Sequence, residues 1–305
     1  MSTVLPFAEA NCLDVKQAGG KGASLARMTA LGLPVPPGFV VPAGALAAAL
    51  PDGGAELRAV LAVSGHAEAA VRAQTIVTTL VMPGALCEAI MRAYAALGPD
   101  DTPVAVRSSA CAEDSEEASF AGQQETYLHV RGAQPVVDRV RDCWASFFSE
   151  RALFYREQKG SLEDLGMAVV VQRMVDADAA GVLFTCDPVH NRRDRMVVEA
   201  VLGLGEGVVS GQLTPDHYVL KRDGRVRKAQ VHVQPYAIVS VPEGGIAERP
   251  LSPEEGGARK LGDEQLAALA RLGDDLERRL GGPQDIEWAL EDGELFVLQA
   301  RPVTA

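Results

Sequence analysis

Residues 284–302 constrain the fold of this chain most, because they predict two short strands joined at Asp292-Gly293. Successive side chains point to opposite faces of a strand, so a one-residue change in pairing moves every side chain to the other face. A two-residue loop would put Glu287 on the face of Leu298. An odd loop with Gly293 in the left-handed region separates the residues cleanly, and we expect that loop. Its apolar face consists of Ile286, Trp288, Leu290, Phe296, Leu298 and Ala300.

The other face of this predicted hairpin carries Asp285, Glu287, Gln299 and Arg301. Two carboxylates at positions i and i+2 of a strand point the same way and can hold Mg²⁺, which usually binds one or two carboxylates together with phosphate oxygens and water. Arg301 beside them would offer a planar fork to a phosphate group. The alternative is a solvated, salt-bridged surface, which the hairpin taken alone favours.

Composition excludes several classes of protein. The chain has 305 residues, of which 47% are hydrophobic, so it can form one two-lobed domain or two domains. Its formal charge is 29 − 41 = −12, which argues against a general nucleic-acid or anionic-membrane binder. No segment resembles a signal peptide or a transmembrane span. Five dispersed cysteines without a C-x-x-C pair indicate free thiols in a reducing compartment, and we expect a cytoplasmic protein.

Two segments in the first half of the chain could contact phosphate. Glycines surround Lys21, and a helix is expected from Gly22 to Leu31, so backbone amides could approach an anion there. A strand over residues 103–107 ends in Arg107, and the polar loop after it should be mobile and close through Gly122 onto a strand over residues 126–130. The alternatives are a flexible glycine turn and an ordinary surface loop.

The rest of the chain predicts alternating helical and extended segments. A long amphipathic helix is expected over residues 135–158, and a second helix from Asp263 to Leu280 that Gly281 ends. The buried strand 168–172 ends in Gln172 and should form a hairpin with strand 181–185. Another strand, 196–200, contains Glu199 and precedes a glycine-rich loop at residues 203–211.

Taken together and in order, these motifs resemble one family. They are Gly-Gly-Lys-Gly at residues 19–22, Val-Arg-Ser-Ser at 106–109, Ser-Phe-Ala-Gly-Gln-Gln-Glu-Thr at 119–126, Val-Gln-Arg-Met-Val at 171–175, Gly-Val-Leu-Phe-Thr at 181–185 with Asp187-Pro188, Glu-Ala-Val-Leu-Gly-Leu-Gly-Glu at 199–206, and Asp-Ile-Glu-Trp at 285–288 with Gln-Ala-Arg-Pro at 299–302. The set resembles the N-terminal ATP-binding domain of phosphoenolpyruvate synthase, pyruvate phosphate dikinase and rifampicin phosphotransferase. The resemblance covers nearly the whole chain.

The resemblance implies an α+β protein with an ATP-grasp fold, in which two lobes hold ATP and Mg²⁺. The N-terminal lobe would span residues 1–195, with a lid loop at 108–126, and the C-terminal lobe residues 196–305, with the metal-binding hairpin 284–302. The implied metal ligands are Asp285 and Glu287. The implied catalytic residues are Lys21, Arg107 and Arg301. The implied nucleotide-binding residues are Lys21, Arg107, Gly122, Thr126, Gln172, Glu199, Glu287, Gln299 and Arg301.

Family enzymes pass a phosphoryl or pyrophosphoryl group through a histidine on a separate domain, and no histidine of this chain has a matching context. We therefore expect an ATP-dependent phosphotransferase component that requires a histidine-carrying partner domain or subunit and yields AMP and phosphate. The alternatives are an ATP-grasp ligase that forms an acyl-phosphate with release of ADP, and a non-catalytic nucleotide-binding module. We also expect residues 110–119 to become more protected from hydrogen exchange when nucleotide binds.

Overall fold

The computed structural model describes residues 3–63, 65–99, 101–110, 125–158, 164–190 and 192–303. The chain forms an α+β fold with two compact units, one of residues 1–30 and 37–174, the other of residues 31–36 and 175–305. Gly122 and most of the expected lid loop, residues 111–124, lie outside the described residues, as does the segment 111–119.

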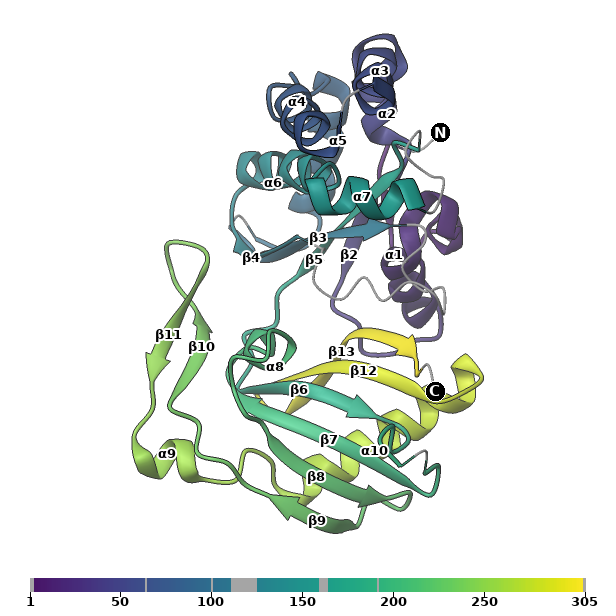
Figure 1. The fold of residues 1–305 in the computed structure, drawn as a ribbon. Helices are drawn as coiled ribbons and strands as arrows, with labels where there is room; N and C mark the ends of the chain where they lie inside the picture. The colour runs from purple at the N-terminus through teal and green to yellow at the C-terminus, as the bar shows by residue number, and fades with distance from the viewer. Residues whose placement is uncertain are drawn as a thin grey trace. The chain divides into compact units, whose positions relative to one another are not determined.

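The first unit is built on a five-stranded antiparallel sheet in the order β1-β2-β5-β3-β4 (Figure 1). Its strands are β1 (Leu5–Pro6), β2 (Gly38–Val41), β3 (Val104–Ala110), β4 (Thr126–Val130) and β5 (Met167–Arg173). Its helices are α1 (Val15–Ala30), α2 (Ala45–Ala49), α3 (Ala55–Val63), α4 (His66–Thr78), α5 (Gly84–Ala95), α6 (Ala133–Ser146) and α7 (Glu150–Gln158), with 3-10 turns η1 (Ala10–Leu13) and η2 (Pro51–Gly54).

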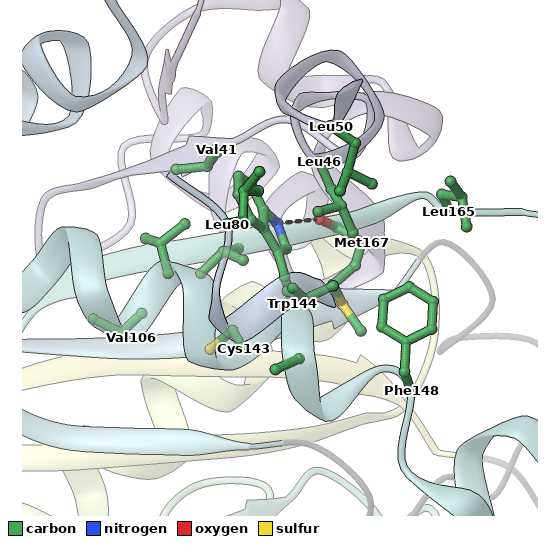
Figure 2. Packing of buried hydrophobic residues seen from close by; sticks show 14 of the residues in the cluster. Val41, Leu46, Leu50, Leu80, Val106, Cys143, Trp144, Phe148, Leu165 and Met167 are labelled. Atoms are coloured by element: carbon green, nitrogen blue, oxygen red, sulfur yellow. Dashed lines mark hydrogen bonds between the residues drawn. The ribbon is translucent and has the colours of Figure 1, made fainter. Parts of the chain in front are cut away.

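The main core of this unit lies on one face of the sheet. Val106 and Val169 point into it from the central strands, and Trp144 of α6 fills its middle. The indole nitrogen of Trp144 donates a hydrogen bond to the carbonyl of Met167 at 3.1 Å, so the largest core side chain leaves no buried donor unsatisfied (Figure 2). The opposite face of the sheet carries Val170, which α1 approaches at Gly22.

The helix expected over residues 135–158 is divided into α6 and α7. The backbone N–H of Ala152 donates to the hydroxyl of Ser149 at 3.4 Å, which is the contact of a helix-capping residue. The guanidinium of Arg156 lies 3.9 Å from the ring centroid of Phe147, so the new helix packs back on the end of the old one. The prediction of helical structure in this region is confirmed, but Ser149 caps a second helix, so the region contains two helices and not one.

The second unit is built on a six-stranded antiparallel sheet in the order β13-β12-β6-β7-β8-β9 (Figure 1). Its strands are β6 (Ala179–Phe184), β7 (Arg195–Leu202), β8 (Asp216–Lys221), β9 (Val226–Gln230), β12 (Gln284–Glu291) and β13 (Glu294–Pro302). A two-stranded hairpin, β10 (Tyr236–Ser240) and β11 (Ile246–Pro250), and the helices α8 (Glu206–Val209), α9 (Pro253–Gly257) and α10 (Asp263–Leu280) complete the unit.

Helix α10 packs on one face of this second sheet and has the bounds that the sequence predicted, with Gly281 in the left-handed conformation at its end. A Cβ at Gly273 of α10 would lie 2.9 Å from a methyl carbon of Leu183 and 3.5 Å from the sulfur of Met196. Leu183 and Met196 therefore point toward α10, and the residues that alternate with them on β6 and β7 point to the other face.

The predicted hairpin of strands 168–172 and 181–185 is wrong. β5 pairs with β2 and β3, whereas β6 pairs with β7 and β12 in the other sheet. The segment between β5 and β6 thus leads from one unit to the other, and the compact units divide after Met174, whereas the sequence placed the boundary after residue 195. The prediction paired the two strands because they are adjacent in sequence, but each of them forms its hydrogen bonds with other strands.

The turn of the terminal hairpin also differs from the expectation. Asp292 and Gly293 have φ values of +50° and +82°, and Glu291 pairs with Glu294, so the loop has two residues and both are left-handed. The odd loop is therefore wrong, although the positive φ of Gly293 is confirmed. The register shifts instead between Glu287 and Trp288, where β13 contains one extra residue, Leu298.

This bulge changes which apolar residues share a face. Val297, rather than Phe296 or Leu298, lies opposite Trp288 and is fully buried. Phe296 and Leu298 pack instead in a small cluster that contains Ala289. The predicted apolar face is thus wrong at Phe296 and Leu298. The change of side-chain parity that an odd loop was expected to give comes instead from the bulge at Leu298.

Candidate nucleotide and metal site

The second unit brings acidic and basic residues together on the face of its sheet that lies away from α10. Glu287 is directly opposite Gln299, and Asp285 is directly opposite Arg301, so all four side chains share one face at one end of the hairpin. The Nε and Nη2 atoms of Arg301 each lie 2.8 Å from Oδ2 of Asp285. The Asp285 side chain is only 12% exposed, whereas that of Arg301 is 57% exposed.

A third carboxylate joins this group through the sheet register. Glu287 on β12 pairs with Val182 on β6, which pairs with Glu199 on β7, so Glu287 and Glu199 are in one row across the sheet. The row continues to His217 on β8, whose Nδ1 atom lies 3.7 Å from Oε1 of Glu199. We call Glu199, Asp285, Glu287, Gln299 and Arg301 the acidic cluster.

The members of the acidic cluster act on one another electrostatically. Burial raises the pKa of Asp285 above its ordinary value, Arg301 opposes this rise, and the negative charges of Glu287 and Glu199 add to it. Carboxylates that repel one another on a half-buried face favour a cation beside them.

The residues of the acidic cluster fit a hard divalent cation. Mg²⁺ prefers oxygen ligands and takes few of them from protein when phosphate oxygens supply the rest. Among the described residues, no group of three or more histidine, cysteine or acidic side chains is arranged to enclose a metal ion. Asp285, Glu287 and Glu199 thus offer carboxylate oxygens of the kind that Mg²⁺ prefers.

In the first unit, three of the predicted residues share the sheet face on which α1 packs. Arg107 on β3 pairs with Thr126 on β4 and with Val170 on β5. Gln172 lies two residues beyond Val170 on β5 and therefore points to the same face. Gln172 is 3% exposed, and Thr126 and Arg107 are half-buried.

Lys21 is held against the same sheet by α1. Its ammonium donates a hydrogen bond to the carbonyl of Ser108 at 3.1 Å, and the residue is 6% exposed. The expected helix of residues 22–31 begins earlier, at Val15, and is interrupted at Gly19, where φ is +69° and ψ is +171°. A Cβ at Gly19 would lie 2.2 Å from the carbonyl oxygen of Ser109, so only glycine fits.

The sequence predicted Lys21 as a site residue but did not single out Ser109, which contacts α1 beside it. Ser109 is fully buried on β3 and is bonded to α1 on both sides of the bend. The available signal was a pair of hydroxyl residues, Ser108 and Ser109, that follow Arg107 within a largely buried strand. Separately, no helix among the described residues has both the length and the hydropathy needed to cross a membrane.

Comparison with known proteins gives this geometry its context. Residues 15–305 match the family model of the pyruvate phosphate dikinase AMP/ATP-binding domain. Over 98% of its length the chain is 43% identical to a probable phosphoenolpyruvate synthase of Methanothermobacter thermautotrophicus, and covers 45% of that protein. It is 37% identical to the phosphoenolpyruvate synthase of Pyrococcus furiosus, with 98% of this chain and 43% of that protein covered.

A third relative has a different named activity. The chain is 36% identical to the rifampicin phosphotransferase of Bacillus cereus, with 99% of this chain and 36% of that protein covered. The chain thus spans less than half the length of each of these relatives, two of which are named as phosphoenolpyruvate synthases and one as a rifampicin phosphotransferase. The sequence match and the mixed helix-and-sheet architecture agree: the chain belongs to the family of pyruvate phosphate dikinase AMP/ATP-binding domains.

Proposed function

We propose that this chain is the ATP-binding component of a dikinase-type phosphotransferase, and that its two units are the lobes of an ATP-grasp fold. It binds Mg²⁺-ATP and presents the β-phosphorus to a histidine on a separate domain or subunit. The observation that carries the proposal is the acidic cluster, because its register sets carboxylates and a guanidinium side by side on one sheet face.

Each member of the acidic cluster has a role in this proposal. Asp285 and Glu287 hold the cation, and Glu199 lies beside the nucleotide in the same row of the sheet. When bound, Mg²⁺ neutralises phosphate charge and polarises the phosphoryl oxygens. Arg301, which is exposed and ion-paired with Asp285, binds a phosphate oxygen through its guanidinium, and Gln299 donates a side-chain amide hydrogen.

The first unit supplies further contacts to the same substrate. Lys21 and Arg107 are the cations for the phosphate chain, and Gly122 and Thr126 belong to the segment that covers it. Gln172 lies on the strand that leads to the adenine site. Because phosphoryl transfer depends mainly on positioning and charge stabilisation, residues fixed on strands and on a helix suit this role.

The reaction is a displacement at the β-phosphorus. A histidine ring nitrogen forms a bond to the β-phosphorus, the bond between this phosphorus and the α–β bridging oxygen breaks, and AMP leaves with that oxygen. Water then forms a bond to the γ-phosphorus, the bond between this phosphorus and the β–γ bridging oxygen breaks, and phosphate leaves. The histidine thus keeps one phosphoryl group for the final acceptor. That the relatives are more than twice as long as the matched region is consistent with a separate acceptor-carrying part.

The nucleotide products test this function. The chain is incubated with Mg²⁺-ATP, alone and with a histidine-carrying domain taken from one of the relatives, and AMP, ADP and phosphate are separated by chromatography. We expect AMP and phosphate only in the presence of the domain, and none when its histidine is replaced by alanine. Release of ADP that depends on a carboxylate substrate would instead identify an acyl-phosphate-forming ligase. Binding of ATP without any turnover would identify a non-catalytic module.

A further inference from the structure

A buried serine hydroxyl is inserted into the backbone hydrogen-bond ladder of α1, directly beside Lys21. In an uninterrupted α-helix the N–H of Gly22 would donate to the carbonyl of Ala18, four residues earlier. Here the N–H of Gly22 donates instead to Oγ of Ser109 at 3.2 Å, and this hydroxyl donates to the carbonyl of Ala18 at 3.0 Å. A side chain inserted in this way is a known cause of sharp helix bends.

The surroundings leave this hydroxyl little freedom. Ser109 is 0% exposed, and its single proton and one of its lone pairs are used by the two bonds to α1. Gly19, at the bend, would place a Cβ 2.3 Å from Oγ of Ser109 if it were any other residue. The contact of Ser109 with the bend therefore requires glycine at position 19.

The inserted hydroxyl is bonded to residues on both sides of Lys21. Lys21 lies between the two backbone groups that Ser109 binds, and its ammonium reaches the carbonyl of Ser108 at 3.1 Å, on the same strand. Arg107 is two residues before Ser109 on β3 and so points to the same sheet face. One strand thus carries Arg107 and, through Ser109, holds the helix segment that carries Lys21.

We propose that Ser109 is a positioning residue for phosphate binding: its hydroxyl holds the α1 bend so that Lys21 and Arg107 are presented as one fixed pair of cations. This inference rests on the proposed function, because it assigns both cations to the triphosphate. Fixing a flexible lysine in advance lowers the conformational entropy that binding would otherwise cost.

The test compares Ser109→Ala with Ser109→Cys, which keeps nearly the same size but is a weaker donor and acceptor. Thr29→Ala is the control, because Thr29 also bonds a backbone carbonyl of α1, that of Leu25, but lies away from the bend. Affinities for Mg²⁺-ATP and for AMP are measured by calorimetry. We expect Ser109→Ala to weaken Mg²⁺-ATP binding by on the order of tenfold, Ser109→Cys to be intermediate and Thr29→Ala to match the parent. AMP binding should change less, because AMP lacks the β- and γ-phosphates of ATP.

Amide hydrogen exchange provides a readout that does not depend on nucleotide. The N–H of Gly22 should exchange slowly in the parent and faster in Ser109→Ala, with global stability compared by thermal unfolding. Unchanged exchange at Gly22, or an equal loss of affinity for Mg²⁺-ATP and AMP, would overturn the positioning role. Faster exchange at Gly22 together with a parent that binds no Mg²⁺-ATP would refute the proposed function and, with it, this role in phosphate binding, while the structural bend would stand.

Discussion

The turn of the terminal hairpin allows the stability of β12 and β13 to be separated from the chemistry of the acidic cluster. Gly293 has a φ of +82°, and a Cβ built on it would find no atom within 4 Å. Gly293→Ala therefore introduces backbone strain without a steric clash. The turn cannot easily relax, because the N–H of Asp292 donates to the carboxylate of Asp178 at 2.9 Å.

The magnitude follows from two opposing contributions. A non-glycine residue in the left-handed region costs about 1–2 kcal/mol. Replacing glycine also restricts the unfolded chain, which returns about 0.4–1 kcal/mol. Gly293→Ala should thus lower the free energy of unfolding by about 1 kcal/mol, which corresponds to a fall in Tm of a few degrees.

Gly282→Ala is the matched control. A Cβ at Gly282 also meets no atom within 4 Å, but its backbone is not in the left-handed region, so only the favourable effect on the unfolded chain remains. We expect this variant to be as stable as the parent or more so. The difference in unfolding free energy between the two variants should be about 1–2 kcal/mol, which is the left-handed cost alone.

Urea denaturation of both variants gives this difference, and titration with Mg²⁺-ATP tests the function. Asp285 is seven residues before Asp292 along β12, roughly 20 Å away at the rise of a strand. Folded Gly293→Ala should therefore bind Mg²⁺-ATP like the parent. Equal stability of the two variants would refute the strain argument, and weaker nucleotide binding by fully folded Gly293→Ala would refute the independence of turn and site.

Three further predictions concern charge. Glu287→Gln keeps the shape of the side chain but removes one carboxylate of the proposed cation site, so Mg²⁺-dependent ATP affinity should fall severalfold and transfer should fall further; a variant that turns over like the parent with its partner domain present would show that the metal assignment is wrong. Arg301→Ala and Lys21→Ala should each weaken triphosphate binding by tenfold or more with little change in Tm, which calorimetry and thermal unfolding check, and unfolding of both would count against their placement. Glu277 should give a pH-dependent contribution to stability: burial raises its pKa, but the hydrogen bonds from Arg222 and Thr185 outweigh burial and leave the pKa below its ordinary 4.5. The lowered pKa stabilises the folded state fully above that ordinary value, and the benefit is lost as the pH falls through the folded pKa. Glu277→Gln should therefore be less stable than the parent at pH 7 and should approach it in acid; a loss independent of pH would exclude this linkage.

The sequence by itself determined the features that depend on local chemistry. The helix from Asp263 to Leu280 could be predicted because its apolar spacing and terminal glycine are local signals. The family resemblance could be recognised because its motifs occur in order over the whole chain. The positive φ of Gly293 was also predictable from a local signal, because an Asp-Gly pair between two strands favours a turn with glycine at positive φ.

Only the tertiary structure decided which strands pair and how. The hairpin predicted between β5 and β6 does not form, because β5 pairs with β2 and β3 and β6 pairs with β7 and β12. The face on which each side chain of β13 lies depends on a bulge at Leu298, and no residue pattern in the sequence indicates this bulge. Glu199 joins the row of Glu287 through the pairing of both strands with β6 at Val182, and Ser109 enters the ladder of α1 from 91 positions away in the sequence. Such contacts depend on the packing of whole elements, so local propensity cannot predict them.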